Sequence, residues 1–373
     1  MTVIDFGEPP SNRSRVLKVS CLITAMCVML TLVLPTGFAV RGPGPTEDTL
    51  GEQSVVVDGE KQLVPLVEIA NADTYPASGE LLLTTVSVGG GPVSDIYPLD
   101  VLEAWASTRR TVIPQEAVFR QGFTREQQQE ESAAEMASSQ ELAVAAALKE
   151  LNVPFTSTLK VAGTTKDSPA VDLVETGDVL TTLNGKDITD HTQLLELLSA
   201  ITPGASVDLG ITRDGKASTV TVTTTEAQNE DGTPRAALGI LVTNSYEFPM
   251  DVTIQIEDIG GPSAGMMFAL AIIDLLTPAD ELAGHTVAGT GTMDADGTVG
   301  PIGGIVQKMY GSSRDGARWF LAPADNCDEV VGNIPSGLRV IRVATLSEAL
   351  AAITAVGEDS ATDLPTCASN TNP

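Results

Sequence analysis

The sequence predicts a multidomain protein of mixed α/β (α+β) class, with an N-terminal membrane-spanning helix, a β-rich module and a larger α/β domain. The helix is predicted by residues 19–40, an apolar run without charge. The β-rich module is predicted by short β-prone runs with Asn-Gly and Asp-Gly turns within residues 151–225. The α/β domain is predicted by an alternating strand pattern after Asp251, which leads through a glycine-rich turn into a strongly apolar helix.

Charge and composition exclude several classes of protein. The 373 residues carry 21 Lys+Arg against 49 Asp+Glu, a net charge of −28. This balance argues against a nucleic-acid-binding protein, because binding to phosphates relies on clustered Lys and Arg. With 42% hydrophobic and 19% charged residues, the chain has enough apolar surface to fold. The two His and four Cys residues are scattered, so we expect no metal site, and no motif indicates another cofactor.

The N-terminal apolar run at residues 19–40 is long enough to span a bilayer. At about 1.5 Å per residue, its 22 residues cover a hydrocarbon core of about 30 Å. Basic residues within the preceding segment, 1–18, favour a cytoplasmic N-terminus and a body outside the membrane. A cleaved signal peptide stays open as the alternative, because Gly37 and Ala39 suit the small-residue positions of a cleavage site.

Cysteine placement agrees with export of the body. Cys21 and Cys27 lie inside the apolar run, where they serve as small hydrophobic residues. Cys327 and Cys367 lie in the exported part, where an oxidising environment favours a disulfide that would tie down the polar tail at residues 358–373. The alternative is one buried thiol and one loose thiol.

Between the apolar run and the β-rich module, two segments have distinct compositions. Residues 41–50 are rich in Gly and Pro and predict a linker. Residues 51–150 begin with β-prone runs and continue into strong helix formers, which predicts strands and helices that pack with the C-terminal domain.

The module at residues 151–225 resembles a bacterial PDZ domain. The resemblance rests on the Gly177-Asp178 pair before a strand, the Asn184-Gly185 turn after it, a following helix and a hairpin with an Asp214-Gly215 turn. It implies that an extended peptide is added to a sheet edge. Residues 153–161 lack the alternation of Gly and hydrophobic residues that forms a carboxylate-binding loop, and 156–161 are only its approximate place. A PDZ-shaped spacer that binds nothing tightly is the alternative.

Ser263 stands at the predicted turn from strand to buried helix, among Gly261, Pro262 and Ala264. A nucleophile suits this place, since glycine lets a substrate approach and free N–H groups of a first helical turn can hold an oxyanion. A helix cap is the alternative role for this serine. The Gly-x-Ser-x-Gly pattern also suggests an esterase with His285 as base, although that histidine follows too soon after the serine.

Lys308 is the only Lys or Arg between residues 236 and 313. It follows a glycine-rich turn at residues 300–304 and has apolar neighbours in Ile305 and Met309. Apolar surroundings lower the pKa of a lysine, and a neutral lysine can take the proton of a serine hydroxyl. An exposed, charged lysine is the alternative.

These motifs together resemble the proteolytic domain of Lon proteases. The resemblance covers residues 234–357 and rests on Gly-Pro-Ser-Ala-Gly at 261–265, Gly-Thr-Gly at 289–291 and the turn and helix at 300–308. It implies a Ser-Lys dyad in which Ser263 is the nucleophile and Lys308 the general base. It also implies that Thr290 hydrogen-bonds the lysine and orients it.

Two departures from Lon define a subtype. The sequence has no Gly-x-x-x-x-Gly-Lys-Ser/Thr loop for ATP, because Gly185-Lys186 is followed by Asp187. Gly260 stands where Lon usually has an acidic residue, although Glu257 and Asp258 are near.

With its apolar N-terminal run and PDZ-like module, the chain resembles the membrane-anchored PDZ-containing Lon-like proteases of bacteria. That resemblance implies an ATP-independent serine endopeptidase at the cell membrane that acts outside the cytoplasm on exposed or extended protein segments, and it suggests a homo-oligomer. A non-catalytic, membrane-anchored PDZ adaptor with a protease-like domain is the alternative.

Overall fold

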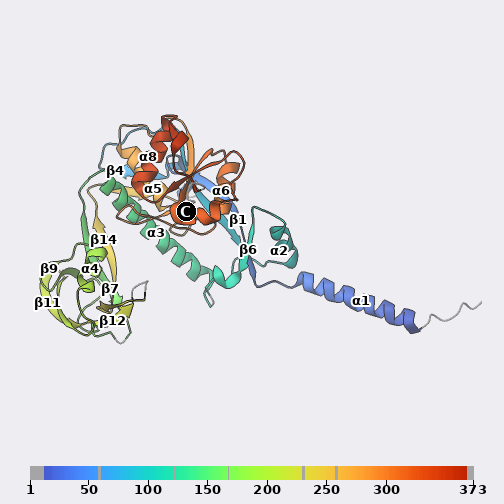
Figure 1. Ribbon diagram of the computed structural model, residues 1–373, viewed down its shortest axis with the longest axis horizontal. Coiled ribbons are helices and arrows are strands. Elements are labelled where there is room, and N and C mark those ends of the chain that lie inside the picture. The colour runs from blue at the N-terminus through green and yellow to red at the C-terminus, as the bar shows by residue number, and fades with distance from the viewer. Residues whose placement is uncertain are drawn as a thin grey trace, which may run out of the picture. The chain divides into compact units, whose positions relative to one another are not determined.

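The computed structural model describes residues 12–57, 60–120, 122–166, 168–228, 232–256 and 259–367. The chain forms two compact units, of which the first comprises Met1–Leu151 with Val252–Pro373 and the second comprises Asn152–Asp251 (Figure 1). The second unit is thus inserted into the sequence of the first. It ends well beyond residue 225, where we expected the β-rich module to end.

The N-terminal apolar run is helical only in part. Helix α1 (Asn12–Val33) precedes Pro35, which cannot continue a helix, and Thr36 then donates its N–H and its Oγ1 hydrogen to Ile96 O at 2.7 and 2.9 Å. Phe38–Asp48 form strand β1. The expected anchor at 19–40 and linker at 41–50 are therefore wrong in their bounds. Among the described residues, no helix combines the length and the apolar character that crossing a membrane requires.

One mixed sheet organises the first unit. Strand β1 pairs antiparallel with its two neighbours, and the remaining neighbours pair in parallel. Most of the expected linker is a strand: Gly42 and Pro43 pair in register with β5 (Glu80–Gly89), and Gly44 and Pro45 fall at a bulge, where such residues are tolerated. In spatial order the strands are β20 (Arg339–Val343), β19 (Trp319–Pro323), β16 (Thr286–Gly289), β5 (Glu80–Gly89), β1 and β6 (Thr111–Pro114).

Helices cover this sheet and form the core with it. Helix α5 (Gly265–Leu276) is apolar on all sides and packs against β5, the long helix α3 (Arg125–Glu150) and α8 (Leu346–Gly357). Helix α6 (Ile305–Arg314) packs against β1 and β5. The other described elements of this unit are α2 (Pro98–Trp105), α7 (Cys327–Val330), β2 (Glu52–Val57), β3 (Glu60–Pro65), β4 (Val67–Ala70), β15 (Asp251–Ile254), β17 (Thr292–Met293), β18 (Val299–Gly300) and the short 3-10 turns Gln115–Ala117, Ala324–Asn326 and Ala361–Asp363.

The second unit is a small sheet with one helix and its own hydrophobic core. Its sheet has the order β11-β10-β8-β7-β14, so β14 (Ile240–Glu247) completes an edge that the sequence analysis left outside the module. The remaining elements are β7 (Thr156–Thr164), β8 (Val179–Leu183), β9 (Lys186–Asp187), α4 (His191–Ser199), β10 (Ser206–Arg213), β11 (Lys216–Thr223), β12 (Thr225–Gln228) and β13 (Pro234–Ala237).

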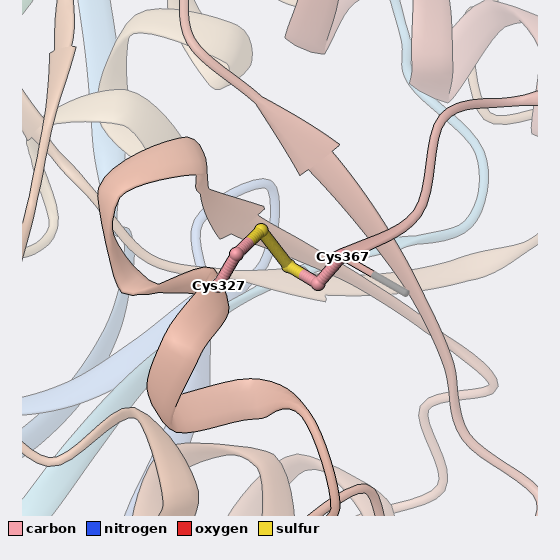
Figure 2. Close-up of a disulfide and its surroundings, with 2 residues drawn as sticks. All are labelled: Cys327 and Cys367. Carbon is pink, nitrogen blue, oxygen red and sulfur yellow. A yellow bond between two sulfur atoms is a disulfide. The ribbon is translucent and has the colours of Figure 1, made fainter. Parts of the chain in front are cut away.

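Cys327 and Cys367 form a disulfide, the pairing that we expected, with their Cα atoms 4.9 Å apart (Figure 2). It joins the start of α7 to the C-terminal segment, as Figure 2 shows. Both cysteines are buried. The disulfide therefore secures the tail as far as Cys367, and the expected tail beyond it, 368–373, lies outside the described residues.

Candidate active site

Ser263 lies in a short loop that α3 holds in place. The N–H of Gly261, a residue with a φ of 86°, donates to Ser132 O at 3.1 Å. Ser139 Oγ donates to the carbonyl of Pro262 at 3.0 Å. Ala264, rather than Ser263, is the N-cap residue of α5, and the helix has no side-chain cap. The serine hydroxyl is therefore not used as a helix cap.

Lys308 is almost completely buried beside this serine. Its side chain is 2% exposed, and its Nζ donates to Ser263 Oγ at 2.7 Å, to Thr290 Oγ1 at 2.9 Å and to Thr84 O at 2.9 Å. Burial, with a smaller contribution from the charge of Arg41, lowers the pKa of Lys308 from 10.5 to about 7. An exposed, permanently charged lysine, the alternative left open above, is thereby excluded.

Thr290 connects the lysine and the serine. It is fully buried after β16, accepts from Lys308 and donates its Oγ1 hydrogen to the carbonyl of Ser263 at 2.9 Å. The N–H of Gly291 donates to the same carbonyl at 2.9 Å. A Cβ at position 291 would lie 2.7 Å from Val299 Cγ1, which explains the glycine there. The Gly-Thr-Gly motif thus fixes the backbone of Ser263 and one contact of Lys308.

Gly260, the departure from the Lon pattern, has a steric cause in this chain. A Cβ at position 260 would lie 2.0 Å from Ser132 Oγ and 2.9 Å from Ser132 Cβ. Helix α3 therefore occupies the space that an acidic side chain would need. Glu257 and Asp258, the acidic residues that we considered as substitutes, lie outside the described residues.

Ser263 and Lys308 open into a pocket of about 370 Å³. Among its described lining residues none is acidic, and the N–H groups of Ser263 and Ala264 donate to no acceptor within the described part of the chain. These two groups are candidates for holding an oxyanion. The lining residues are Pro45, Leu83, Thr84, Thr85, Val86, Ser87, Met136, Ile259, Gly260, Ser263, Ala264, Gly303 and Lys308.

His285 is not brought to this pocket. Its Nε2 lies 3.5 Å from Asp359 Oδ1, and it does not line the pocket that contains Ser263. Asp274 and Asp280, two acidic residues between Ser263 and His285 in the sequence, make other contacts: Asp274 accepts the N–H of Glu281, and Asp280 accepts the N–H of Ser78. The geometry therefore does not favour the hypothesis of an esterase with His285 as base.

Asn326 is a contributor to the site that sequence reasoning missed. Its side chain is 2% exposed, its Oδ1 accepts the N–H of Ile302 at 2.9 Å, and its Nδ2 donates to Ile302 O at 2.9 Å. Ile302 lies in the glycine-rich turn that begins the helix of Lys308. A single Asn after a strand carries no periodic or spacing signal, so only the fold reveals this contact.

The second unit has a groove of about 220 Å³ between α4 and the edge strand β14. At one end lies Leu238-Gly239-Ile240, in which Gly239 has a φ of 67° and its carbonyl accepts from the N–H of Thr165 at 2.9 Å. This segment has one glycine between two hydrophobic residues, so it lies beside the groove without the full alternation of Gly and hydrophobic residues that we sought at 153–161. The lining residues are Thr165, His191, Leu194, Leu195, Leu198, Arg235, Ala237, Leu238, Gly239, Ile240 and Val242.

Family models match both parts of the chain. Residues 256–355 match the Lon protease (S16) C-terminal proteolytic domain, and residues 138–224 match the PDZ domain. Lon protease 1 of Sorangium cellulosum (strain So ce56) is 40% identical over 94 residues, which are 24% of this chain and 11% of that protein. Lon protease 2 of Bacillus subtilis (strain 168) is 34% identical over 109 residues, 27% of this chain and 19% of that protein.

The chain therefore spans less than a fifth of these two relatives. Among solved structures, the PDZ domain of an SdrC-like protein from Listeria monocytogenes is 23% identical and matches over 22% of this chain and 85% of its own, with a TM-score of 0.20. The PDZ domain of the SdrC-like protein from Listeria innocua is 21% identical over 23% of this chain and 92% of its own, also with a TM-score of 0.20. The chain thus carries a Lon-type proteolytic domain, which supports serine peptidase activity, and a PDZ domain.

Proposed function

We propose that this protein is an ATP-independent serine endopeptidase in which Ser263 is the nucleophile and Lys308 the general base. The main support for the proposal is the 2.7 Å contact between Lys308 Nζ and Ser263 Oγ, two residues that line the same pocket. A lysine whose pKa is about 7 is neutral in a large fraction of molecules near neutral pH, so it can accept a proton.

The proposed reaction follows from these contacts. Neutral Lys308 accepts the hydroxyl proton as Ser263 Oγ attacks a peptide carbonyl, and the N–H groups of Ser263 and Ala264 stabilise the oxyanion. Thr84 O and Thr290 Oγ1 accept hydrogen bonds from the resulting ammonium group. Lys308 then gives its proton to the leaving amine, the C–N bond breaks, and water hydrolyses the acyl-enzyme with Lys308 again as base.

The pocket suits an extended peptide segment. Strand β16 ends at Gly289, paired with Leu83, whereas β5 continues along the pocket through residues 84–87. A substrate strand can lie beside this continued part of β5, as peptides do when they extend a sheet. The sequence contains no ATP-binding loop, which supports action on segments that are already exposed or unfolded.

We assign substrate recognition to the groove of the PDZ domain. Apolar side chains of α4 and an edge strand, β14, line it, and such grooves accept peptide ends. Leu195→Glu, which places a charge in the groove, is expected to weaken cleavage of some protein substrates and leave acylation by a small serine-reactive probe within twofold. Glu196→Gln, on the exposed side of the same helix, is the control. Unchanged rates for every protein substrate in Leu195→Glu would overturn this assignment.

We further propose that the protein works outside the cytoplasm. The Cys327–Cys367 disulfide supports this, because disulfides persist in oxidising compartments. Thiol labelling of the protein taken from its native cells, with and without prior reduction, tests the proposal. Labelling of Cys327 and Cys367 without reduction would contradict it.

Degradation of an unfolded protein substrate tests the peptidase proposal itself. Wild type and His285→Ala are expected to degrade it, whereas Ser263→Ala and Lys308→Ala are not. Degradation by Lys308→Ala at the wild-type rate would refute the dyad. Binding of the substrate without degradation by wild type would favour the adaptor alternative.

A further inference from the structure

Arg41 lies next to the catalytic pocket, on strand β1 between β5 and β6. It pairs with Val88 on one side and Thr111 on the other. Its guanidinium packs on the turn before α6, since a Cβ at Gly303 would lie 3.4 Å from Nη1 and 3.6 Å from Nη2. Gly303 lines the pocket that holds Ser263 and Lys308. The guanidinium of Arg41 therefore lies directly behind a lining residue of the pocket, although Arg41 itself does not line it.

The guanidinium has no counter-ion in the described part of the chain. Its Nε is buried without a hydrogen-bond partner, and no carboxylate forms an ion pair with it. Three exposed arginines do form ion pairs, Arg110 with Glu103, Arg120 with Glu131 and Arg314 with Asp315, whereas Arg342 shares with Arg41 a buried Nε without a partner among the described residues. Arg41 is distinguished by its place, because its guanidinium lies against Gly303, which lines the pocket of Ser263 and Lys308.

The turn before α6 is shaped to keep the arginine there. Gly304 has a φ of 77°, and a Cβ on it would lie 2.8 Å from Arg41 Cδ and 2.9 Å from Val86 Cγ1. The two adjacent glycines thus make room for the arginine stem and the guanidinium. The arginine stays close enough for its charge to act on Lys308.

We propose that Arg41 forms a substrate subsite that binds a carboxylate close to the scissile bond. The planar guanidinium pairs with carboxylates through two hydrogen bonds, and its neighbourhood supplies no competing acid among the described lining residues. The carboxylate can come from an acidic side chain or from the C-terminus of a peptide. This inference rests on the proposed peptidase function.

A peptide series tests the subsite. Internally quenched peptides carry one Glu or one Gln at successive positions around the cleaved bond, each with a free or an amidated C-terminus. For wild type, we expect kcat/KM to be about 10-fold or more higher for the Glu peptide than for the Gln peptide at one position, or for the peptide with a free C-terminus than for the amidated one. A charge-assisted hydrogen-bonded pair contributes an effect of this size. In Arg41→Met this ratio should fall to about 1, and Arg41→Lys should retain part of it.

Arg318→Met is the matched control, because Arg318 is exposed and does not line the pocket. Its ratios should equal those of wild type. Ratios close to 1 throughout in wild type, or a preference that survives in Arg41→Met, would overturn the subsite. A preference for Glu in amidated peptides assigns an acidic side chain, and one for the free terminus assigns the terminal carboxylate.

Binding separates failure of the subsite from failure of the peptidase proposal. Anisotropy titrations of the same peptides against Ser263→Ala and Ser263→Ala/Arg41→Met need no catalysis. We expect the Kd ratio between Gln and Glu peptides, or between amidated and free ones, to be about 10 in the first protein and about 1 in the second. Equal ratios in both proteins would reject the subsite, whereas absence of cleavage by wild type would reject only the peptidase.

Discussion

Lys308 and Asp274 are both 2% exposed, and they differ in what surrounds the buried group. Burial shifts each pKa toward the neutral form: that of Lys308 falls to about 7, and that of Asp274 rises from 3.8 to about 6. Lys308 Nζ has three acceptors, one of which is Ser263 Oγ. Asp274 Oδ1 accepts the N–H of Glu281, and its Oδ2 has no partner within the described residues.

The comparison shows that a shifted pKa does not by itself make a base. Asp274 lies in the C-terminal half of α5, where its nearby charges are the acidic groups of Asp280 and Glu281. Neither it nor those neighbours line the pocket that contains Ser263. Lys308 combines the same degree of burial with a hydroxyl at 2.7 Å, which gives its neutral form a proton to accept.

The largest expected effect is on peptidase activity, which should fall when Lys308 is replaced and stay nearly unchanged when Asp274 is replaced. Lys308→Met should lower kcat/KM for peptide cleavage by about 10³-fold or more, because the serine loses its base. Asp274→Asn should stay within about 3-fold of wild type, since Asp274 lies outside the pocket. Steady-state kinetics at pH 8 measure both. A loss in Asp274→Asn comparable to that in Lys308→Met would break the comparison.

The next effect concerns the turn that positions Lys308. Asn326→Ala leaves the N–H and carbonyl of Ile302 without their partner, so we expect kcat to fall about 10- to 100-fold with a smaller change in KM. Asn326→Asp, which can accept the N–H but cannot donate, should recover part of kcat. Asn333→Ala, which removes a contact to Glu329 O, is the control. A wild-type kcat in Asn326→Ala would show that Asn326 does not help to position Lys308.

The smallest effect is on the free energy of unfolding, whose dependence on pH has opposite signs for Asp274 and Lys308. The raised pKa of Asp274 makes the folded state hold a proton, so its stabilisation is complete below about pH 3.8 and is lost as pH rises through about 6. Asp274→Asn should therefore increase the free energy of unfolding by about 1–2 kcal/mol at pH 8, with the gain vanishing toward pH 4.

Lys308 has the opposite dependence. Its lowered pKa makes the folded state release a proton, so stability is complete above about pH 10.5 and is lost as pH falls toward about 7. Denaturant unfolding of wild type, Asp274→Asn and Lys308→Met across this pH range measures both trends. A gain in Asp274→Asn that does not depend on pH would show that its carboxyl is not desolvated in the way described.

Much of the candidate site could be predicted from the sequence, because its motifs are local. Ser263 stands in a short glycine-rich turn, Thr290 in Gly-Thr-Gly, and Lys308 was conspicuous as an isolated cation. The structure brings these three within hydrogen-bond distance of one another. Asn326 and Arg41 were missed because their contacts join segments far apart in the sequence, and neither residue stands in a repeating pattern.

The fold was harder to predict where a segment depends on a distant partner. Residues 41–50 have the composition of a linker, yet 41–48 form part of β1 because β5 supplies their hydrogen-bond partners. Strand β14 returns to the edge of β7 after a long excursion, so the end of the second unit at Asp251 had no local signal. The first helix ends at Val33 because Pro35 cannot continue it, whereas the prediction followed the apolar run as far as residue 40.

The most direct measurement is the pH dependence of Ser263 acylation by a small serine-reactive phosphonate probe, followed by intact mass. A Ser263–Lys308 dyad predicts an acylation rate that rises with pH to a plateau, with a midpoint near the Lys308 pKa of about 7, and that is lost in Lys308→Ala and Ser263→Ala. Wild-type labelling rates in Lys308→Ala, or a wild-type midpoint near the ordinary lysine value of 10.5, would contradict it.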